Sequence, residues 1–443
     1  MKLPYAEVSI DKKGAFADPA QLTEVARLLG EKRPTDILVL SHGWNSSRGQ
    51  ARDLYEKLVD SITAVRGDVP GAGARRLFVV GVIWPSIQWA PDENDGAGAS
   101  AGGPADALAD LVTQRIESPT IRKRLIALIP RLDTDPEARA EFLAQLRKSV
   151  PARVLKETED GDAPPTRFAT GDADDVFTVV KGTPGRRRRG TGTAAGGAAS
   201  VGETGGAGGV AETGGGETGG GAGFSLGGFF DAARNLVNIT TFYTMKDRAG
   251  AVGQKGIAKL LERVHAEAPD AKLHLVGHSF GGRAVTAAAL ATTAPISSVT
   301  LLQAAYSHYG LARNFDRPDW DKPGVLPGRN GAFADMPAKI GGPVLVSHTR
   351  NDKAVGMAYA IAARLAGHVG VDLGDASDTF GGMGSNGAQR TPGAVAGELL
   401  PVGGTYTFRR GVVYNVKSDA FISGHSAITS REVGYAVLSA VVS

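Results

Sequence analysis

The chain of 443 residues contains no cysteine. This absence excludes disulfides, thiolate nucleophiles and cysteine-based zinc or iron–sulfur sites, and it agrees with a reducing compartment. An excess of one charge is also missing, because 49 Lys and Arg face 46 Asp and Glu and leave a formal net charge of +3. Proteins that bind nucleic acid by neutralising phosphates carry a larger positive excess. We therefore expect no nucleic-acid partner.

Long hydrophobic runs are missing as well. No stretch of 18 apolar residues occurs, so we expect no integral membrane segment. The first residues, MKLPYAEVSIDKKG, contain no apolar run of the length that a signal peptide needs. The expected location is the cytoplasm, and export by a route that reads no N-terminal signal stays open. We also find no metal-binding motif and no complete phosphate loop, so we expect no metal and no organic cofactor.

What is present is a repeated alternation of short apolar runs and helical patterns. Near-continuous apolar strands are typical of a parallel sheet covered on both faces. Strands that alternate with helices favour a doubly wound α/β domain. The expected strands are 36–43, 77–84, 272–277, 298–305, 343–348 and 411–416, and the expected helices include 49–65, 251–267 and 354–366.

This alternation breaks between about residues 87 and 230. Within the break, 104–149 shows helical patterns, with Pro119 and Pro136 placed where a helix prefers its first residues. Residues 182–228 hold 20 glycines in 47 positions, so they have too little apolar surface to offset the entropy of ordering. We expect a helical insertion over 91–181 that could cap a site, and a flexible loop over 182–230.

Two serines match the pattern G-x-S-x-G, which marks an exposed nucleophile at a strand–helix turn in one large group of hydrolases. Ser225, in GFSLGG, lies inside the glycine-rich tract and has no strand before it. Ser279, in VGHSFGG, follows the apolar run KLHLV and precedes a helical pattern, with Gly277 and Gly281 leaving room for a tight turn. We predict that Ser279 is the nucleophile and that Ser225 is a coincidence of composition. A tight turn with a chance serine is the alternative for Ser279.

The segment GHSFGG, together with SHGWN at 41–45, resembles the α/β-hydrolase superfamily of serine esterases, lipases and related enzymes. The resemblance covers about 1–90 and 231–443. It implies an α/β-hydrolase fold, with a mostly parallel eight-stranded sheet and flanking helices, interrupted here by the helical and glycine-rich insertion. It also implies a catalytic triad in the order nucleophile, acid, histidine.

In that order the base comes after the last strand, where His368 and His425 are the candidates. His425, in SDAFISGHSAI, lies just beyond the expected strand 411–416, whereas His368 ends a helical pattern. We therefore predict His425 as the base. The family places the acid in a loop after a later strand, where PVLVSHTRNDKAVG contains Asp352. A helix N-cap is the alternative role for Asp352, and Asp419 is the second candidate for the acid.

A tetrahedral intermediate carries an oxyanion that two fixed N–H groups must stabilise. One donor should be the residue after the nucleophile, Phe280. By resemblance to the family's loop after an early strand, we assign the other to Trp44, with Gly43 allowing the backbone to turn. His42, in the same loop, is expected to make structural hydrogen bonds rather than to act as a base.

The function expected is a serine hydrolase that cleaves a carboxylic ester through an acyl-enzyme, acting on a small-molecule or lipid ester. The same set of residues serves thioesterases, amidases and peptidases, so the acyl chain, the alcohol group and the oligomeric state stay open. Two alternatives remain. One is a catalytically inactive binding protein with this fold, and the other is a membrane-acting lipase effector whose insertion forms a lid.

Overall fold

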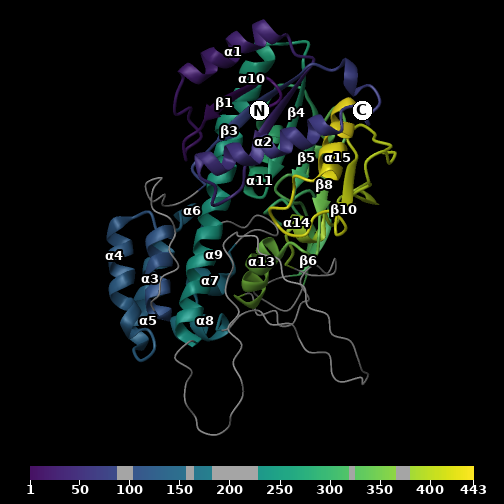
Figure 1. The fold of residues 1–443 in the computed structure, drawn as a ribbon. Helices are drawn as coiled ribbons and strands as arrows, with labels where there is room; N and C mark the ends of the chain where they lie inside the picture. Colours follow the sequence, from purple (N-terminus) through teal and green to yellow (C-terminus); the bar gives the residue numbers. More distant parts are fainter. Residues whose placement is uncertain (87–102, 156–163, 182–227, 319–324, 366–379) are drawn as a thin grey trace, which may run out of the picture.

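The structure is a computed structural model that describes residues 1–86, 103–155, 164–181, 228–318, 325–365 and 380–443 (Figure 1). Ser225 and His368 lie outside them, as does the tract 182–227.

The centre of the fold is an eight-stranded sheet in the order β1-β3-β2-β4-β5-β8-β10-β9. Every pairing between its strands is parallel, so the carboxyl ends of all eight strands meet at one edge. The expected α/β-hydrolase sheet is confirmed. A separate antiparallel pair joins β6 to β7. The strands of both sheets are β1 (Tyr5–Ser9), β2 (Asp36–Ser41), β3 (Leu77–Ile83), β4 (Lys272–His278), β5 (Ile296–Leu302), β6 (Phe315–Pro318), β7 (Val325–Arg329), β8 (Val344–His348), β9 (Val395–Glu398) and β10 (Val413–Lys417).

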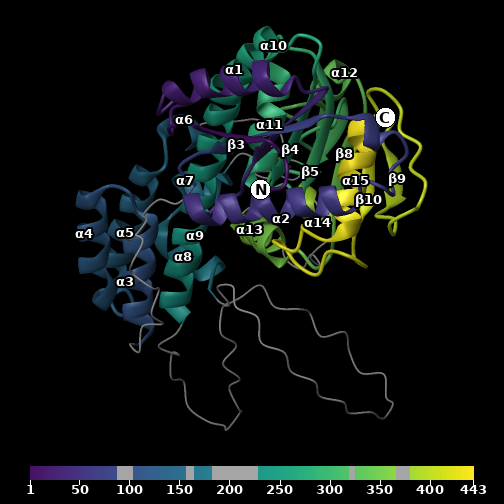
Figure 2. The same ribbon diagram turned by 45° about the horizontal axis from the view of Figure 1, so that its top comes forward.

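Helices cover both faces of the sheet because its central strands are apolar on both faces. In β2, Ile37 and Val39 belong to one core cluster, whereas Leu38 and Leu40 belong to the other. On the second face α2 and α15 lie side by side, and both views show this pair together (Figures 1 and 2). The helices around the sheet are α1 (Ala20–Lys32), α2 (Arg48–Ala64), α10 (Ala258–Glu267), α11 (Phe280–Ala291), α12 (Met336–Lys339), α13 (Lys353–Leu365), α14 (Met383–Asn386) and α15 (Arg431–Val442).

The described parts of 103–181 are helical and lie beside the sheet, packed on the long helix α9 (Figure 1). Ser118 and Asp135 cap two of these helices, and Pro119 and Pro136 are their first residues, as predicted. None of the helices in the described part of the chain has both the length and the apolar character that a membrane crossing requires. These helices are α3 (Pro104–Arg115), α4 (Pro119–Leu128), α5 (Pro136–Ser149), α6 (Ala152–Leu155), α7 (Thr166–Thr170), α8 (Ala173–Val179) and α9 (Gly228–Ala251).

Helix α9 was not predicted, although it joins the two parts of the molecule. It runs for 24 residues and contacts α3 and α5 as well as α11 of the core. It then continues through a π-helical turn, Val252–Ile257, into α10. A side chain at Gly253 would begin 2.2 Å from the carbonyl oxygen of Ala284, so only glycine permits this close packing against α11.

The edge strands β1 and β9 also escaped sequence analysis. Only alternate residues of β1 are buried, and β9 has no buried residue. Strands of this kind lack the continuous apolar run that marks the central strands. Sequence alone therefore found the strands that are buried on both faces and missed those at the edges.

Candidate active site

Ser279 occupies the turn between β4 and α11, and its backbone is strained. Its φ is 57° and its ψ is −126°, a region that non-glycine residues rarely enter. The Ser279 N–H donates to the carbonyl oxygen of Leu302 at 3.0 Å, and its carbonyl oxygen accepts from the N–H of Ala305 at 3.0 Å. The end of β5 and the residues directly after it therefore hold the serine in this conformation. The residue is 3% exposed.

Three glycines let the backbone segments around this serine approach one another. A side chain at Gly43 would begin 2.6 Å from Cβ of Ser279, and one at Gly281 would begin 2.1 Å from the carbonyl oxygen of Ser41. The Cβ atom of a larger residue at Gly277 would lie 2.4 Å from the carbonyl oxygen of Gly281. Larger residues at Gly43 or Gly281 would push the chain at the end of β2 away from the turn, and a larger residue at Gly277 would push the start of α11 away from β4. The glycine spacing that marked Ser279 in the sequence therefore has a steric cause.

The structure brings Asp352 and His425 into contact at the same edge of the sheet. Nδ1 of His425 lies 2.9 Å from Oδ2 of Asp352, across a separation of 73 residues. The other carboxylate oxygen, Oδ1, accepts the N–H of Val355 at 3.1 Å in the first turn of α13. The carboxylate therefore caps this helix and holds the histidine at once. The Asp352 side chain is buried, whereas that of His425 is 21% exposed.

Asp419, the second candidate for the acid, is engaged elsewhere. Its Oδ1 accepts from the hydroxyl of Thr349 at 2.9 Å and from the N–H of Arg350 at 3.1 Å, and its Oδ2 accepts from Nε of Arg350 at 3.1 Å. Burial raises the pKa of Asp419, but these hydrogen bonds outweigh it and hold the pKa below its usual value. Among the hydrogen bonds of the described residues, none joins Asp419 to His425. Asp419 instead orders the loop that carries Asp352.

A second histidine, His278, supports the backbone of His425. Its Nε2 lies 2.9 Å from the carbonyl oxygen of His425, and the two rings have centroids 4.9 Å apart. Because a carbonyl oxygen only accepts, Nε2 of His278 carries the proton. Burial lowers the pKa of His278 to about 3, so the ring stays neutral. Sequence analysis did not assign this role.

The hydroxyl of Ser279 and the ring of His425 are not joined by a hydrogen bond in the described part of the chain. Both belong to the same edge, because His278 immediately precedes Ser279 and contacts His425. Contacts between a nucleophile and its base are often long before a substrate binds. The fold therefore brings a serine, a histidine and a carboxylate to the same edge of the sheet.

The two residues expected to form an oxyanion hole flank this serine. Phe280 is the first residue of α11, so its N–H has no partner within the helix. The close contact between Gly43 and Ser279 brings the peptide between Gly43 and Trp44 beside the turn. The ring of Trp44 packs edge-on against that of Phe280, with centroids 6.3 Å apart.

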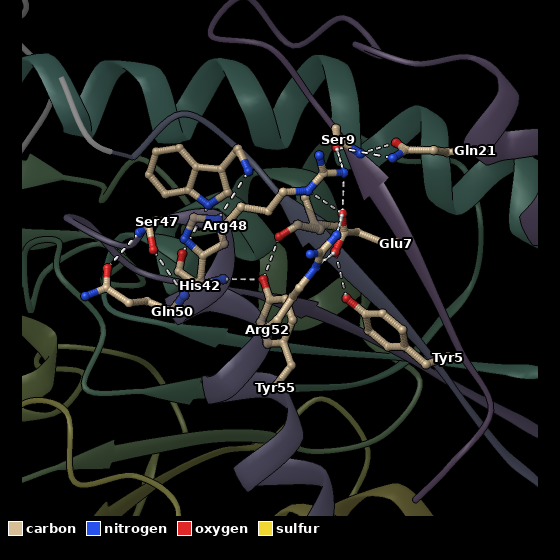
Figure 3. Close-up of polar contacts among 12 residues, drawn as sticks. Tyr5, Glu7, Ser9, Gln21, His42, Ser47, Arg48, Gln50, Arg52 and Tyr55 are labelled. Atoms are coloured by element: carbon tan, nitrogen blue, oxygen red, sulfur yellow. Dashed lines mark hydrogen bonds and ion pairs between the residues drawn. The ribbon is translucent and has the colours of Figure 1, made fainter. Parts of the chain in front are cut away.

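His42 anchors the loop that carries Trp44. Its backbone N–H donates to the hydroxyl of Tyr55 at 2.8 Å (Figure 3). Its Nε2 accepts the backbone N–H of Trp84 at 3.2 Å. The His42 ring also stacks on the indole of Trp84, with centroids 5.3 Å apart. Burial lowers the pKa of His42 to about 4, so the ring is neutral. These contacts fit the structural role expected for His42.

The far end of this loop is tied to the first strand. Ser47 and Gln50 form a capping box at the start of α2. Beyond it, Arg48 and Arg52 both bind the carboxylate of Glu7 in β1 (Figure 3). Burial raises the pKa of Glu7, but the two arginines outweigh it and hold the pKa below its usual value. Both ends of the loop are therefore fixed, as preorganised N–H donors require.

Gln303 and Gly384 also shape the site, and sequence analysis missed both. Gln303 follows β5 with a φ of 44°, and its Nε2 donates to the carbonyl oxygen of Gly384 at 3.3 Å. A side chain at Gly384 would begin 2.9 Å from Oδ2 of Asp352. Gln303 therefore holds the backbone that lies against the carboxylate. The available signal was only its place at the end of a central strand, because glutamine carries no characteristic chemistry.

Comparisons with known proteins agree with this architecture. A family model described as the alpha/beta hydrolase fold matches residues 246–334. No match was found among curated proteins or among solved structures. The matched segment contains β4, the turn at Ser279, α11 and β5. Together with the parallel sheet around it, this match supports an α/β-hydrolase fold for the chain.

Proposed function

We propose that the protein is a serine hydrolase that cleaves a carboxylic ester through an acyl-enzyme. The observation that carries this proposal is the 2.9 Å contact between Nδ1 of His425 and Oδ2 of Asp352. It lies at the sheet edge where Ser279 is held with a φ of 57°. A carboxylate on Nδ1 fixes the tautomer that leaves Nε2 free to accept a proton.

In the first half of the reaction, the hydroxyl oxygen of Ser279 attacks the ester carbonyl carbon while its proton passes to Nε2 of His425. The buried carboxylate of Asp352 stabilises the resulting imidazolium. The N–H groups of Trp44 and Phe280 stabilise the oxyanion of the tetrahedral intermediate. The intermediate collapses when the bond to the alcohol oxygen breaks, and the imidazolium gives its proton to the departing alcohol.

In the second half, water attacks the acyl-enzyme. His425 accepts a proton from the water, and the second tetrahedral intermediate uses the same two N–H groups. The bond to Ser279 then breaks, and the proton returns to the serine oxygen as the carboxylic acid leaves. Each side chain regains its starting protonation state, so the cycle balances without a cofactor.

The surroundings of the serine support an ester with an apolar acyl group. The ring of Phe280 packs on that of Phe242 with centroids 5.2 Å apart, and it also contacts the ring of Trp44 with centroids 6.3 Å apart. Apolar and aromatic walls with a few fixed polar groups are typical of sites for small molecules.

A fluorophosphonate probe tests the proposal directly, because it reacts only with an activated serine. We expect the intact chain to be labelled at Ser279, as located by peptide mapping, and to hydrolyse chromogenic esters. Ser279→Ala should abolish both. A correctly folded chain that neither reacts with the probe nor hydrolyses any of an acyl-length series of esters would contradict the proposal and favour a binding role for the fold.

A further inference from the structure

A cavity of about 340 Å³ lies where the insertion helices meet α9 and the loop after β1. We call it the junction cavity. Its volume falls in the range of sites for small ligands. Its wall is mostly polar or charged, and it includes Lys12, Arg115, Glu117, Ser118 and Lys148. No step of the proposed reaction uses these residues.

The charges around the junction cavity favour an anion. Three cationic side chains line it, from Lys12, Arg115 and Lys148, against one acidic side chain, from Glu117. That carboxylate is already bound by Lys12 at 3.1 Å and by the guanidinium of Arg248. In the ion pairs of the described residues, Arg115 and Lys148 have no carboxylate partner. The cavity therefore has positive charge that the described acidic groups do not neutralise.

Arg115 carries the strongest sign of a missing partner. Its Nε is buried and makes no hydrogen bond within the described part of the chain. A buried donor without an acceptor is unfavourable, and burial also lowers the pKa of this guanidinium. The planar fork of a guanidinium matches the two oxygens of a carboxylate or a phosphate. A bound anion would give Nε of Arg115 the acceptor that it lacks.

The hydroxyl of Ser118 adds a second donor. Its oxygen accepts the N–H of Ile121 as the N-cap of α4, which leaves the hydroxyl proton available. The first turn of α4 also lies at the junction cavity, because Ile121 lines it together with Ser118. The positive end of a helix favours negative charge. The positive end of α4 therefore adds to the attraction that Arg115 and Lys148 exert on an anion.

Arg115 also connects the junction cavity to the candidate active site. Its guanidinium carbon lies 4.7 Å from the centroid of the Trp44 ring, and its Nη1 donates to Oδ1 of Asn45 at 3.1 Å. Asn45 has a φ of 60°, so this hydrogen bond supports a left-handed turn directly after Trp44. One side chain thus lines the cavity and holds the loop expected to supply an oxyanion donor.

We propose that the junction cavity binds the carboxylate or phosphate group of a small ligand, and that Arg115 couples this binding to the loop that carries Trp44. The binding itself does not depend on chemistry at Ser279, whereas the coupling rests on the proposed function. The anionic group has two sources, either an acidic ester substrate or a separate effector. The experiments distinguish these sources.

Binding is tested by calorimetric titration of the full chain with inorganic phosphate at low salt. Lys148→Gln and Arg115→Met should each weaken the affinity about tenfold, since a hydrogen bond to a charged group contributes at about this level. The matched control is Lys123→Gln, which removes a charge from an exposed position of α4 outside the cavity. Absence of phosphate binding to the wild type, or equal binding by all the variants, would overturn the proposal. Lys148 is exposed, so its variant tests the proposal even if Arg115→Met fails to fold.

Coupling is tested with two esters of matched length, 4-nitrophenyl butanoate and the mono-4-nitrophenyl ester of butanedioic acid. If the substrate supplies the anion, the ratio of kcat/KM for the acidic over the neutral ester should fall about tenfold in Lys148→Gln. The ratio should not change in Lys123→Gln. Phosphate should then compete with the acidic ester alone.

If a separate effector supplies the anion, phosphate should change kcat for the neutral ester. It should do so in the wild type and not in Arg115→Lys, because an ammonium keeps the charge but cannot span the anion, Trp44 and Asn45 together. Phosphate that binds without either effect would overturn the coupling. Phosphate binding to a chain that hydrolyses no ester would instead refute the proposed function and leave the binding site standing.

Discussion

The described residues include two aspartate–histidine pairs, one in loops beyond the carboxyl edge of the sheet and one within its strands, and only the first stands beside a strained serine. Nδ1 of His425 contacts Asp352 at 2.9 Å in loops beyond the carboxyl ends of β8 and β10. Nε2 of His274 contacts Asp36 at 3.2 Å, within β4 and β2 near the opposite edge. The second pair even has a serine, because the hydroxyl of Ser298 in β5 lies 2.8 Å from Nδ1 of His274.

The surroundings of the two sets differ. Asp36, His274 and Ser298 are at most 1% exposed, whereas the His425 side chain is 21% exposed. Burial lowers the pKa of His274, with Asp36 opposing the shift. Burial raises the pKa of Asp36, but hydrogen bonds from His274 and from Thr35 hold it below its usual value. The buried set therefore acts as a polar tie between three neighbouring strands.

The comparison teaches that residue types do not define a catalytic site. Ser298 lies within a strand, where its hydroxyl is enclosed and its backbone amide belongs to the sheet. Ser279 lies at a turn, beside the first N–H of a helix and the loop that carries Trp44. An ester carbonyl needs both an approach path and oxyanion donors, and we propose that Trp44 and Phe280 supply the donors at the carboxyl edge.

The largest effect should come from breaking the proposed catalytic set. Ser279→Ala and His425→Ala should each lower kcat for a small ester by about 10⁴-fold or more, because members of a triad act as a unit. Ser298→Ala should leave kcat within a few-fold of the wild type. Steady-state kinetics on variants with unchanged circular dichroism check this. Loss of turnover in a folded Ser298→Ala variant would contradict our distinction between the two serines.

The buried pair should instead govern stability. His274→Leu removes a partner of the buried Asp36 carboxylate and should lower the free energy of unfolding by about 3–5 kcal/mol. The folded fraction should keep its turnover. Asp352→Asn should show the reverse pattern, with a large loss of kcat because the amide can hold the imidazole in the wrong tautomer. Urea unfolding and ester kinetics on both variants provide the measurement. If both variants lost stability and kcat to the same extent, the two pairs would not have different roles.

An intermediate effect should follow from the support that His278 gives to His425. His278→Leu removes the donor to the His425 carbonyl oxygen and should lower kcat by about 10-fold to 100-fold with little change in KM, since misplacing a catalytic group is costly. His278→Gln keeps an N–H donor and should recover part of the rate. If both variants lose the same rate, the role of His278 is packing and not positioning.

Buried histidines should also make stability depend on pH. Burial lowers the pKa of His42 to about 4 and that of His278 to about 3, from an ordinary value of 6.5. Below pH 6.5 the unfolded chain binds protons that these folded rings do not. The free energy of unfolding should therefore decrease as the pH is lowered below 6.5, by up to about 1.4 kcal/mol per pH unit for each histidine. The decrease should level off below the pKa of each histidine in the folded chain.

This dependence is measured by urea unfolding between pH 7 and pH 4.5. His42→Asn should reduce the slope by the contribution of one histidine, whatever it does to stability at pH 7. A slope equal to that of the wild type would show that His42 is not held neutral in the folded chain.

The smallest effects should come from changes outside the described residues. Ser225→Ala and His368→Ala should leave ester turnover near that of the wild type. Replacing about 186–222 with a short Gly/Ser linker should also leave turnover and the melting temperature nearly unchanged, because each doubling of loop length costs only about 0.6 kcal/mol. A collapse of turnover in Ser225→Ala, or of the melting temperature in the shortened chain, would refute our interpretation of this tract.

Local patterns of residues were enough to predict the central strands and the candidate nucleophile. The apolar runs that became β2, β3, β4, β5 and β8 are buried along most of their length, and β10 places Val413 and Val416 in the two core clusters, so these strands were recognisable from the sequence. The motif around Ser279 is local too, because a strained turn, two glycines and a helix start lie within a few residues. Asp352 and His425 followed from the family order, and their sequence neighbourhoods alone left Asp419 and His368 as alternatives.

Contacts between residues far apart along the chain became visible in the folded structure alone. In the folded chain Asp419 accepts hydrogen bonds from Thr349 and Arg350, whereas Asp352 contacts His425. The fold also places Gln303 against Gly384, and Arg115 between the junction cavity and Trp44, although no local pattern distinguishes either side chain. Periodicity and turn chemistry act over a few residues, whereas these contacts arise where a parallel sheet gathers the ends of strands that are far apart along the chain.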